Sequence, residues 1–216
     1  HGANAHLWYL YMIIGLYCSI PFLRKIIKNA SVREIEIFLM LWFLSMFVQY
    51  KIFRNYVPSI DLTFFSGYVG YLVLGYYLSI KSFSMAKIVP YLAYGLLVVF
   101  TAYITWYMSR SSNKFDPTFY NYTFFNTALA TAFLFIALKI TFSNAQKMPQ
   151  WATTIDSYSF SIYLIHILPL NYIHPWISKH LDTALVIPIA TVLAIGASII
   201  IAYLLRQLPG GKYVSG

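Results

Sequence analysis

The residues best suited to chemistry lie together in an apolar stretch late in the chain, residues 157–177 and the position before it. Asp156, Ser159, Tyr163 and His166 follow one another at spacings of three, four and three, so a helix would place them on one face. At ~1.5 Å per residue, the imidazole would lie roughly 15 Å along the axis from the carboxylate, near the middle of a bilayer. An ionisable group at that depth needs a hydrated or hydrogen-bonded setting. The spacing therefore predicts a polar cavity inside the membrane.

Three further residues bear on this stretch. Pro169 lies three residues beyond His166 and should kink the helix, because it lacks an N–H and its ring is bulky. His6 and His174 each lie at the end of a predicted span, where an interfacial polar role is the alternative to a functional one. No pair of histidines has the His-x3-His spacing that places two ligands on one helix face, so no metal site is predicted.

Composition indicates the kind of protein that positions these residues. Of 216 residues, 60% are hydrophobic and 10% are charged, and the mean hydropathy is +0.66. Soluble domains have roughly 45–50% apolar and 25% charged residues, so we expect an integral membrane protein. The net charge of +9 is spread over short loops, which indicates topology and anionic lipid rather than a nucleic-acid partner. The lone Cys18 excludes an intramolecular disulfide.

Seven hydrophobic runs predict an all-α bundle of seven transmembrane helices. Each run has about the 17–25 residues of a span and lacks the alternation of a β-barrel strand. Short loops, without a Gly/Ser linker or an internal repeat, predict a single domain over residues 1–216. The runs are Leu7–Leu23, Ile35–Phe53, Leu62–Ile80, Ile88–Met108, Tyr122–Phe142, Ile155–Ile177 and Leu185–Leu205.

Small residues predict where these helices approach one another. Gly67, Tyr71 and Gly75 share one face of the third run and predict a close approach there. Asn126, Thr127 and Thr131 in the fifth run are expected to hydrogen-bond across helices.

Basic residues predict the orientation of the chain in the membrane. Ten of the fifteen lie in alternate loops or in the tail, which the positive-inside rule assigns to the cytoplasm. They are Arg24, Lys25, Lys28, Arg33, Lys81, Lys87, Lys139, Lys147, Arg206 and Lys212. The other five are Lys51, Arg54, Arg110, Lys114 and Lys179. The chain should therefore start outside and end in the cytoplasm, with Lys139 extending from its span toward the cytoplasmic interface.

Three stretches resemble the membrane acyltransferase-3 family. His6-Leu-Trp-Tyr-Leu, followed by Pro21-Phe-Leu-Arg24, resembles the family's early His-Leu-Trp segment. Residues 65–77, Phe-Ser-Gly-Tyr-Val-Gly-Tyr-Leu-Val-Leu-Gly-Tyr-Tyr, resemble its Gly-Tyr-rich helix. Residues 159–166, Ser-Phe-Ser-Ile-Tyr-Leu-Ile-His, are similar to its late Ser-x-x-Ile-Tyr-Leu-x-His signature. The stretches follow the family's order along the whole chain.

The resemblance implies a multi-pass enzyme of the inner (plasma) membrane. Such an enzyme would move an acyl group, usually acetyl, from cytoplasmic acetyl-CoA or another acyl-CoA to hydroxyls of an extracytoplasmic or surface polysaccharide, without a bound cofactor. Family members have about ten spans with both termini cytoplasmic, so this chain would be the C-terminal part of one. The family's best-known histidine and its Arg-x-x-Arg pair would then precede His1, and the chain alone is expected to be inactive.

O-acetylation of a glycan would need a base to deprotonate the attacking hydroxyl and fixed donors for the oxyanion. The resemblance implies His166, Tyr163 and His6 as catalytic candidates, acting as base, proton relay or hydrogen-bond donor. Trp8, Ser159 and His174 are the substrate-binding candidates. The basic loop from Arg24 to Arg33 is a candidate for attracting CoA phosphates, although the positive-inside rule alone accounts for its charge.

A transporter or flippase for a lipid-linked saccharide is the alternative hypothesis. It would also need a broken helix and polar groups near the midplane, and Pro169 with the His166 face fits that requirement too.

Overall fold

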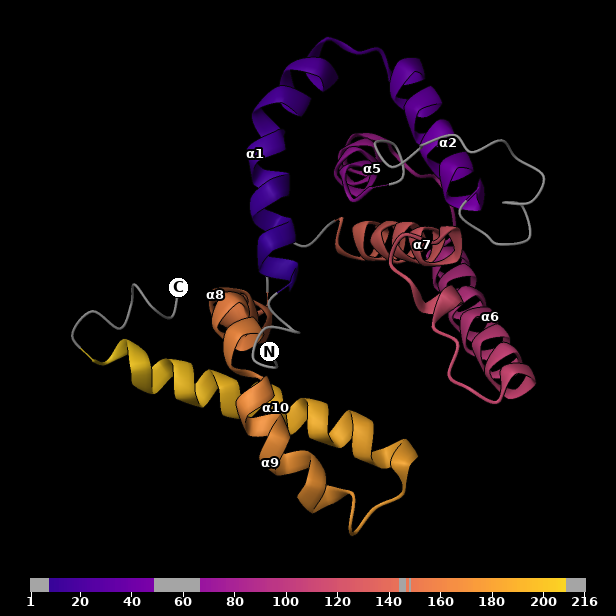
Figure 1. Cartoon of the computed structure of the whole chain (residues 1–216). Coiled ribbons are helices and arrows are strands. Elements are labelled where there is room, and N and C mark those ends of the chain that lie inside the picture. The colour runs from indigo at the N-terminus through magenta and orange to yellow at the C-terminus, as the bar shows by residue number, and fades with distance from the viewer. Residues whose placement is uncertain (1–7, 49–66, 144–146, 148, 209–216) are drawn as a thin grey trace. The chain divides into compact units, whose positions relative to one another are not determined.

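The computed structural model describes residues 8–48, 67–143, 147 and 149–208, with the side chains of Trp8 and Val48 excepted (Figure 1). Every regular element in these ranges is a helix, which confirms the predicted all-α fold. The helices are α1 Trp8–Asn29, α2 Val32–Val48, α5 Val69–Ile80, α6 Ile88–Ser112, the 3-10 helix η1 Thr118–Tyr120, α7 Phe125–Phe142, α8 Gln150–Ile165, α9 Ile167–Ile177 and α10 Thr183–Arg206. Residues 1–144 and 145–216 form two compact units.

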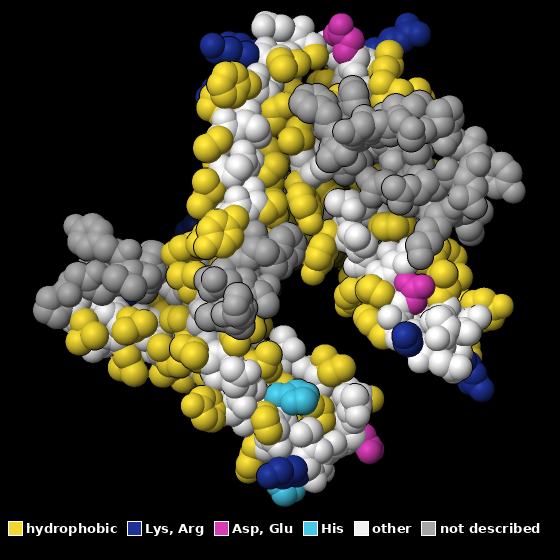
Figure 2. Space-filling view, viewed as in Figure 1, with side chains coloured by type: hydrophobic (Ala, Val, Ile, Leu, Met, Phe, Trp, Pro, Cys, Tyr) yellow, Lys and Arg dark blue, Asp and Glu magenta, His cyan; other side chains and the backbone are white. Residues whose placement is uncertain are grey.

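Four segments in the described ranges are long and apolar enough to cross a membrane: Tyr9–Asn29, Ile88–Ser112, Thr118–Phe142 and Thr183–Arg206. They correspond to the first, fourth, fifth and seventh predicted runs. The second and third runs extend into residues 49–66, outside the described ranges, and the sixth run is divided between α8 and α9. Hydrophobic side chains cover much of the visible helical surface, and most visible Lys and Arg side chains lie near helix ends (Figure 2). The molecule is therefore a helical membrane protein.

Trp42 on α2 is the centre of the first unit. Its ring is fully buried in a core built from α2, α5 and α7, and its Nε1 donates to the Gly67 carbonyl at 3.1 Å. A Cβ atom added to Gly70 would lie 2.1 Å from the indole, so only glycine permits this contact. The predicted close approach is found at Gly67 and Tyr71, which both contact Trp42, and it is tightest at Gly70, which was not predicted. It is not found at Gly75, where a Cβ would meet no atom within 4 Å. Choosing Gly70 over Gly75 from the sequence would have required knowing which face of α5 packs against α2.

Lys139 on α7 joins the same helices at one end. Its ammonium donates to the carbonyls of Leu78, Ser79 and Lys81 at 2.8, 2.6 and 2.8 Å, where α5 ends. Those carbonyls have no partner within the helix, and the negative end of the helix dipole favours a cation there. Sequence reasoning expected Lys139 to extend toward the membrane interface. Its position in the membrane stays a prediction, but its partners are the last carbonyls of α5.

An ion pair connects the end of α5 to the start of α2. Lys81 lies 2.8 Å from Glu36, and the hydroxyl of Tyr77 donates to the same carboxylate at 2.6 Å. The hydrogen bonds with Glu36 and Tyr77 raise the pKa of Lys81 above its usual value, so the ammonium stays charged at neutral pH.

The predicted contact across helices is confirmed for Asn126, whose buried amide donates to Thr101 Oγ1 on α6 at 2.9 Å. It is wrong for Thr127 and Thr131, whose hydroxyls donate to the carbonyls of Asn121 and Thr127, because a threonine hydroxyl in a helix often bonds to nearby backbone.

The second unit is built on α10. Both α8 and α9 pack against it, and a row of small residues spaced by four is buried along it: Ala190, Ala194, Ser198 and Ala202. At the end of α10, Arg206 donates to the Ser157 carbonyl at 2.7 Å, and its guanidinium lies 4.1 Å from the ring centre of Tyr158. These contacts fix α8 on α10.

The Lys139 contact leads to a prediction about stability. Lys139→Met keeps the apolar stem but removes the charged donor, leaving three carbonyls without it. We expect a loss of about 1.5–3 kcal/mol, because hydrogen bonds to charged groups contribute that much. For a chain of this size, the thermal unfolding midpoint should fall by roughly 3–12 °C. Lys147→Met, at an exposed position, is the control and should change the midpoint little. Equal midpoints for both variants would contradict the assignment.

The uneven distribution of basic residues leads to a prediction about topology. Cys18 is exposed and is first replaced by serine, so that each introduced cysteine is the one thiol available for labelling. A cysteine at position 147 should resist a membrane-impermeant thiol reagent in intact cells, and one at position 114, next to Asn113, should react. The opposite labelling pattern would show that the predicted orientation is wrong.

Candidate functional site

His166 lies where α8 and α9 meet. α8 ends at Ile165 and α9 begins at Ile167, and the two helices run in different directions (Figure 1). Pro169 is in the first turn of α9. It has no N–H to donate to the Ile165 carbonyl, and its ring crowds that group. The predicted kink is thus confirmed, and it is located at His166 because a proline acts on the carbonyl four residues before it.

The imidazole of His166 is held by backbone of the preceding turn. Its Nδ1 lies 2.8 Å from the Tyr163 carbonyl oxygen and 3.1 Å from that of Ile162. Carbonyl oxygens only accept, so Nδ1 carries the hydrogen, and in the neutral ring the lone pair is then on Nε2. The ring is half-buried. This geometry orients the imidazole and places its hydrogen on Nδ1.

Tyr163 is the nearest of the predicted partners. Its ring centre is 6.2 Å from that of His166, and the side chain is half-buried. Ser159, one turn earlier, and Asp156, near the start of the face, are both exposed. The structure therefore brings Tyr163 and His166 together. It places Ser159 on the same helix at an exposed position, and Asp156 too far along the helix to contact the imidazole.

Ser161 was not singled out from the sequence, yet it is fully buried. Serines alternate at positions 157, 159 and 161, and successive members are about 200° apart around a helix, so they cannot share one environment. The alternation indicated that the serines have different environments, but identifying the buried one required knowing how α8 packs.

The other predicted residues lie away from the His166 junction or outside the described residues. His174 is exposed in the last turn of α9, eight residues beyond His166. His6 and the side chain of Trp8 lie outside the described residues, so their roles stay predictions. No group of three or more His, Cys, Asp or Glu side chains that would hold a metal ion occurs in the described ranges.

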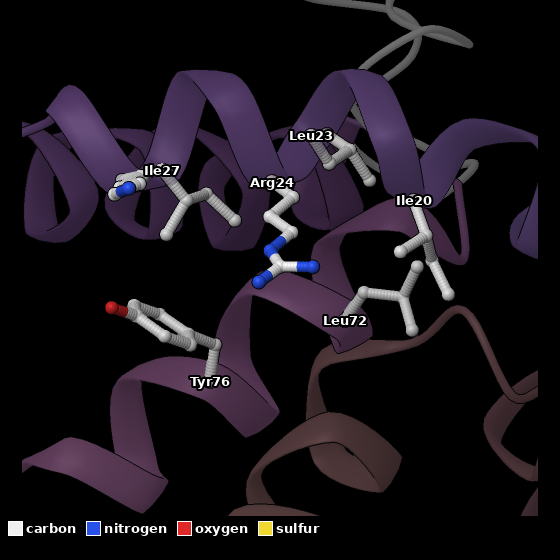
Figure 3. A pocket seen from close by; sticks show the side chains of 7 residues that line it. Ile20, Leu23, Arg24, Ile27, Leu72 and Tyr76 are labelled. Atoms are coloured by element: carbon white, nitrogen blue, oxygen red, sulfur yellow. The ribbon is translucent and has the colours of Figure 1, made fainter.

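A groove in the first unit is a second candidate region. It has a volume of about 460 Å³ and lies between α1 and α5. Its lining consists of Ile20, Leu23, Arg24, Ile27, Lys28, Leu72 and Tyr76. Figure 3 shows the Arg24 side chain directed from α1 into the space between the two helices. The groove combines apolar walls with two cations, which is the character of a site for an anionic amphiphile.

Comparison with known proteins gives one match. The family model described as acyltransferase domain, acyltransferase-3, matches residues 1–203 of the 216. The match covers the first compact unit and most of the second, including the His166 junction. Searches of curated proteins and of solved structures find no match.

The kink at His166 leads to a prediction about helix geometry. Spin labels at positions 151 and 176, both exposed, report the distance between the ends of α8 and α9. Pro169→Ala restores an N–H for the Ile165 carbonyl, so the pair should straighten. The distance should increase toward ~37 Å, the length of 25 residues of continuous helix.

Pro175→Ala, inside α9 and beyond the junction, is the matched control and should leave the distance nearly unchanged. If Pro169→Ala also leaves it unchanged, packing against α10 rather than the proline sets the bend.

Proposed function

We propose substrates and a mechanism from one premise: the chain belongs to the membrane-bound acyltransferase-3 family and is an acyltransferase. The proposed reaction moves an acyl group, acetyl in the first instance, from cytoplasmic acyl-CoA to a hydroxyl of an extracytoplasmic or lipid-linked glycan. The enzyme would lie in the inner membrane, with this chain entering from outside and ending in the cytoplasm. Family membership favours this reaction over the flippase hypothesis, because a flippase has no acyl group to transfer.

The orientation of the His166 ring is the main observation that supports this mechanism. With Nδ1 donating to the Tyr163 carbonyl, Nε2 is the nitrogen that accepts the proton of the acceptor hydroxyl. The hydroxyl oxygen forms a bond to the thioester carbonyl carbon, and the carbon–sulfur bond breaks. The thiolate of CoA then leaves and takes up the proton from the imidazolium. The ester product and free CoA balance the reaction, and His166 returns to its neutral form.

The remaining candidates have supporting roles in this proposal. Tyr163, beside His166, would donate its hydroxyl to the oxyanion of the tetrahedral intermediate or to a sugar hydroxyl. Ser159 and His174 are exposed and would contact substrate from either side of the junction. His6 and Trp8 are proposed as a further base and a sugar-stacking ring, respectively.

His166→Ala tests the mechanism. In the whole enzyme, glycan acylation should fall by about 10²-fold or more, since general acid–base catalysis contributes that much. The amount of protein in the membrane should change little, because removing a half-buried imidazole relieves a desolvation cost. The measurement is mass spectrometry of the glycan, beside an immunoblot of the membrane fraction. Tyr163→Phe keeps the ring, removes one hydroxyl and should give a smaller loss.

Ile167→Ala is the matched control. Ile167 is the next residue and is half-buried like His166, but its side chain points ~100° away around the helix axis. Acylation should be near the level of the unmodified enzyme. Equal activity of the His166 and Ile167 variants would show that the polar face serves helix packing only, and the site assignment would fail.

A further inference from the structure

The groove between α1 and α5 has an apolar wall. Ile20, Leu23 and Ile27 lie on one face of α1, and Leu72 on α5 faces them across the gap (Figure 3). None of the apolar window of α1 is buried inside the protein. In a bilayer, a groove along such a helix is open to lipid chains rather than to water.

Two cations line the same groove. Arg24 and Lys28 are four residues apart, so they share a face of α1 one turn from each other, within the last two turns of the helix. The guanidinium of Arg24 is directed into the gap, and Tyr76 lies across from it on α5 (Figure 3). The lining contains no acidic side chain.

The nearest carboxylates in the sequence are engaged elsewhere. Glu34 accepts hydrogen bonds from the backbone N–H and hydroxyl of Ser31 at 2.6 and 2.7 Å, closing the start of α2. Glu36 pairs with Lys81. Within the described part of the chain, the only salt bridge is that pair, so neither Arg24 nor Lys28 has a carboxylate partner. The groove therefore presents two positive charges beside apolar walls.

We propose that this groove binds an anionic phospholipid. Its phosphate would lie between Arg24 and Lys28, where the guanidinium forms paired hydrogen bonds with phosphate oxygens and the ammonium adds charge. An acyl chain would follow the wall formed by Ile20, Leu23 and Leu72. The two cations lie in the last two turns of α1, and the apolar wall extends one turn further toward the middle of the helix. A phospholipid in a leaflet has the same arrangement, with its charged headgroup at the surface and its acyl chains toward the middle of the bilayer.

Coenzyme A is a poorer match for this lining. It carries several phosphate charges and an adenine ring, whereas the groove offers two cations and one tyrosine. The lipid would bridge α1 and α5 by occupying the space between them.

Native mass spectrometry of the delipidated whole protein tests the proposal. Dioleoyl phosphatidylglycerol is titrated beside dioleoyl phosphatidylcholine, which has the same chains and no net charge. The anionic lipid should bind more tightly. Arg24→Gln should weaken its binding about fivefold, the effect expected for one basic residue near a lipid surface, and leave phosphatidylcholine unchanged. Leu72→Trp, which fills the apolar end of the groove, should weaken both lipids.

Lys25→Gln is the matched control, because it removes one charge from the adjacent position, which does not line the groove. Its effect should be within twofold. Equal losses for Arg24→Gln and Lys25→Gln would show general attraction to charge and overturn the site. Displacement of the bound phosphatidylglycerol by coenzyme A would also overturn it, in favour of a nucleotide site. The readout is binding, so it is independent of whether His166 catalyses acyl transfer.

Discussion

The ammonium of Lys139 at the end of α5 is the contact on which the first unit depends. α5 has twelve residues and cannot satisfy its own last carbonyls, and three of these accept from Lys139. Carbonyls at a helix end need a donor from outside the helix, and a cation is favoured there by the helix dipole. The same end of α5 carries Lys81, whose pair with Glu36 connects it to α2. α5 is thereby fixed to α2 and α7, and its other face presents Leu72 and Tyr76 to the groove.

The second unit uses backbone carbonyls in a related way. Pro169 interrupts the helix and produces a junction, and the carbonyl of Tyr163 in the turn before it accepts from the His166 ring. In the first unit a side chain stabilises a helix end, whereas here the helix end orients a side chain. In both units a side-chain donor meets backbone carbonyls at a helix end.

Local properties were predictable from the sequence, and pairings between distant segments were not. Helical runs follow from hydropathy and the kink from Pro169, because each depends on residues within a few positions. The contact of Trp42 with Gly70 could not be chosen over Gly75, since that depends on the rotation of α5 against α2. The acceptors of Lys139 are about 60 positions away in sequence, and no local pattern identifies them. Ser161 was missed for the same reason, because its burial depends on how α8 packs.

In the proposed mechanism His166 would accept a proton and release it in every cycle, and a carbonyl is well suited to orient such a histidine. A carboxylate beside the ring would add a full negative charge and hold the imidazolium firmly, the more so in a medium of low dielectric constant. Asp156 is the acidic residue on this helix, and ten positions place it roughly 15 Å from His166 along the axis. The dipole of the Tyr163 carbonyl fixes the tautomer and the ring direction without that charge.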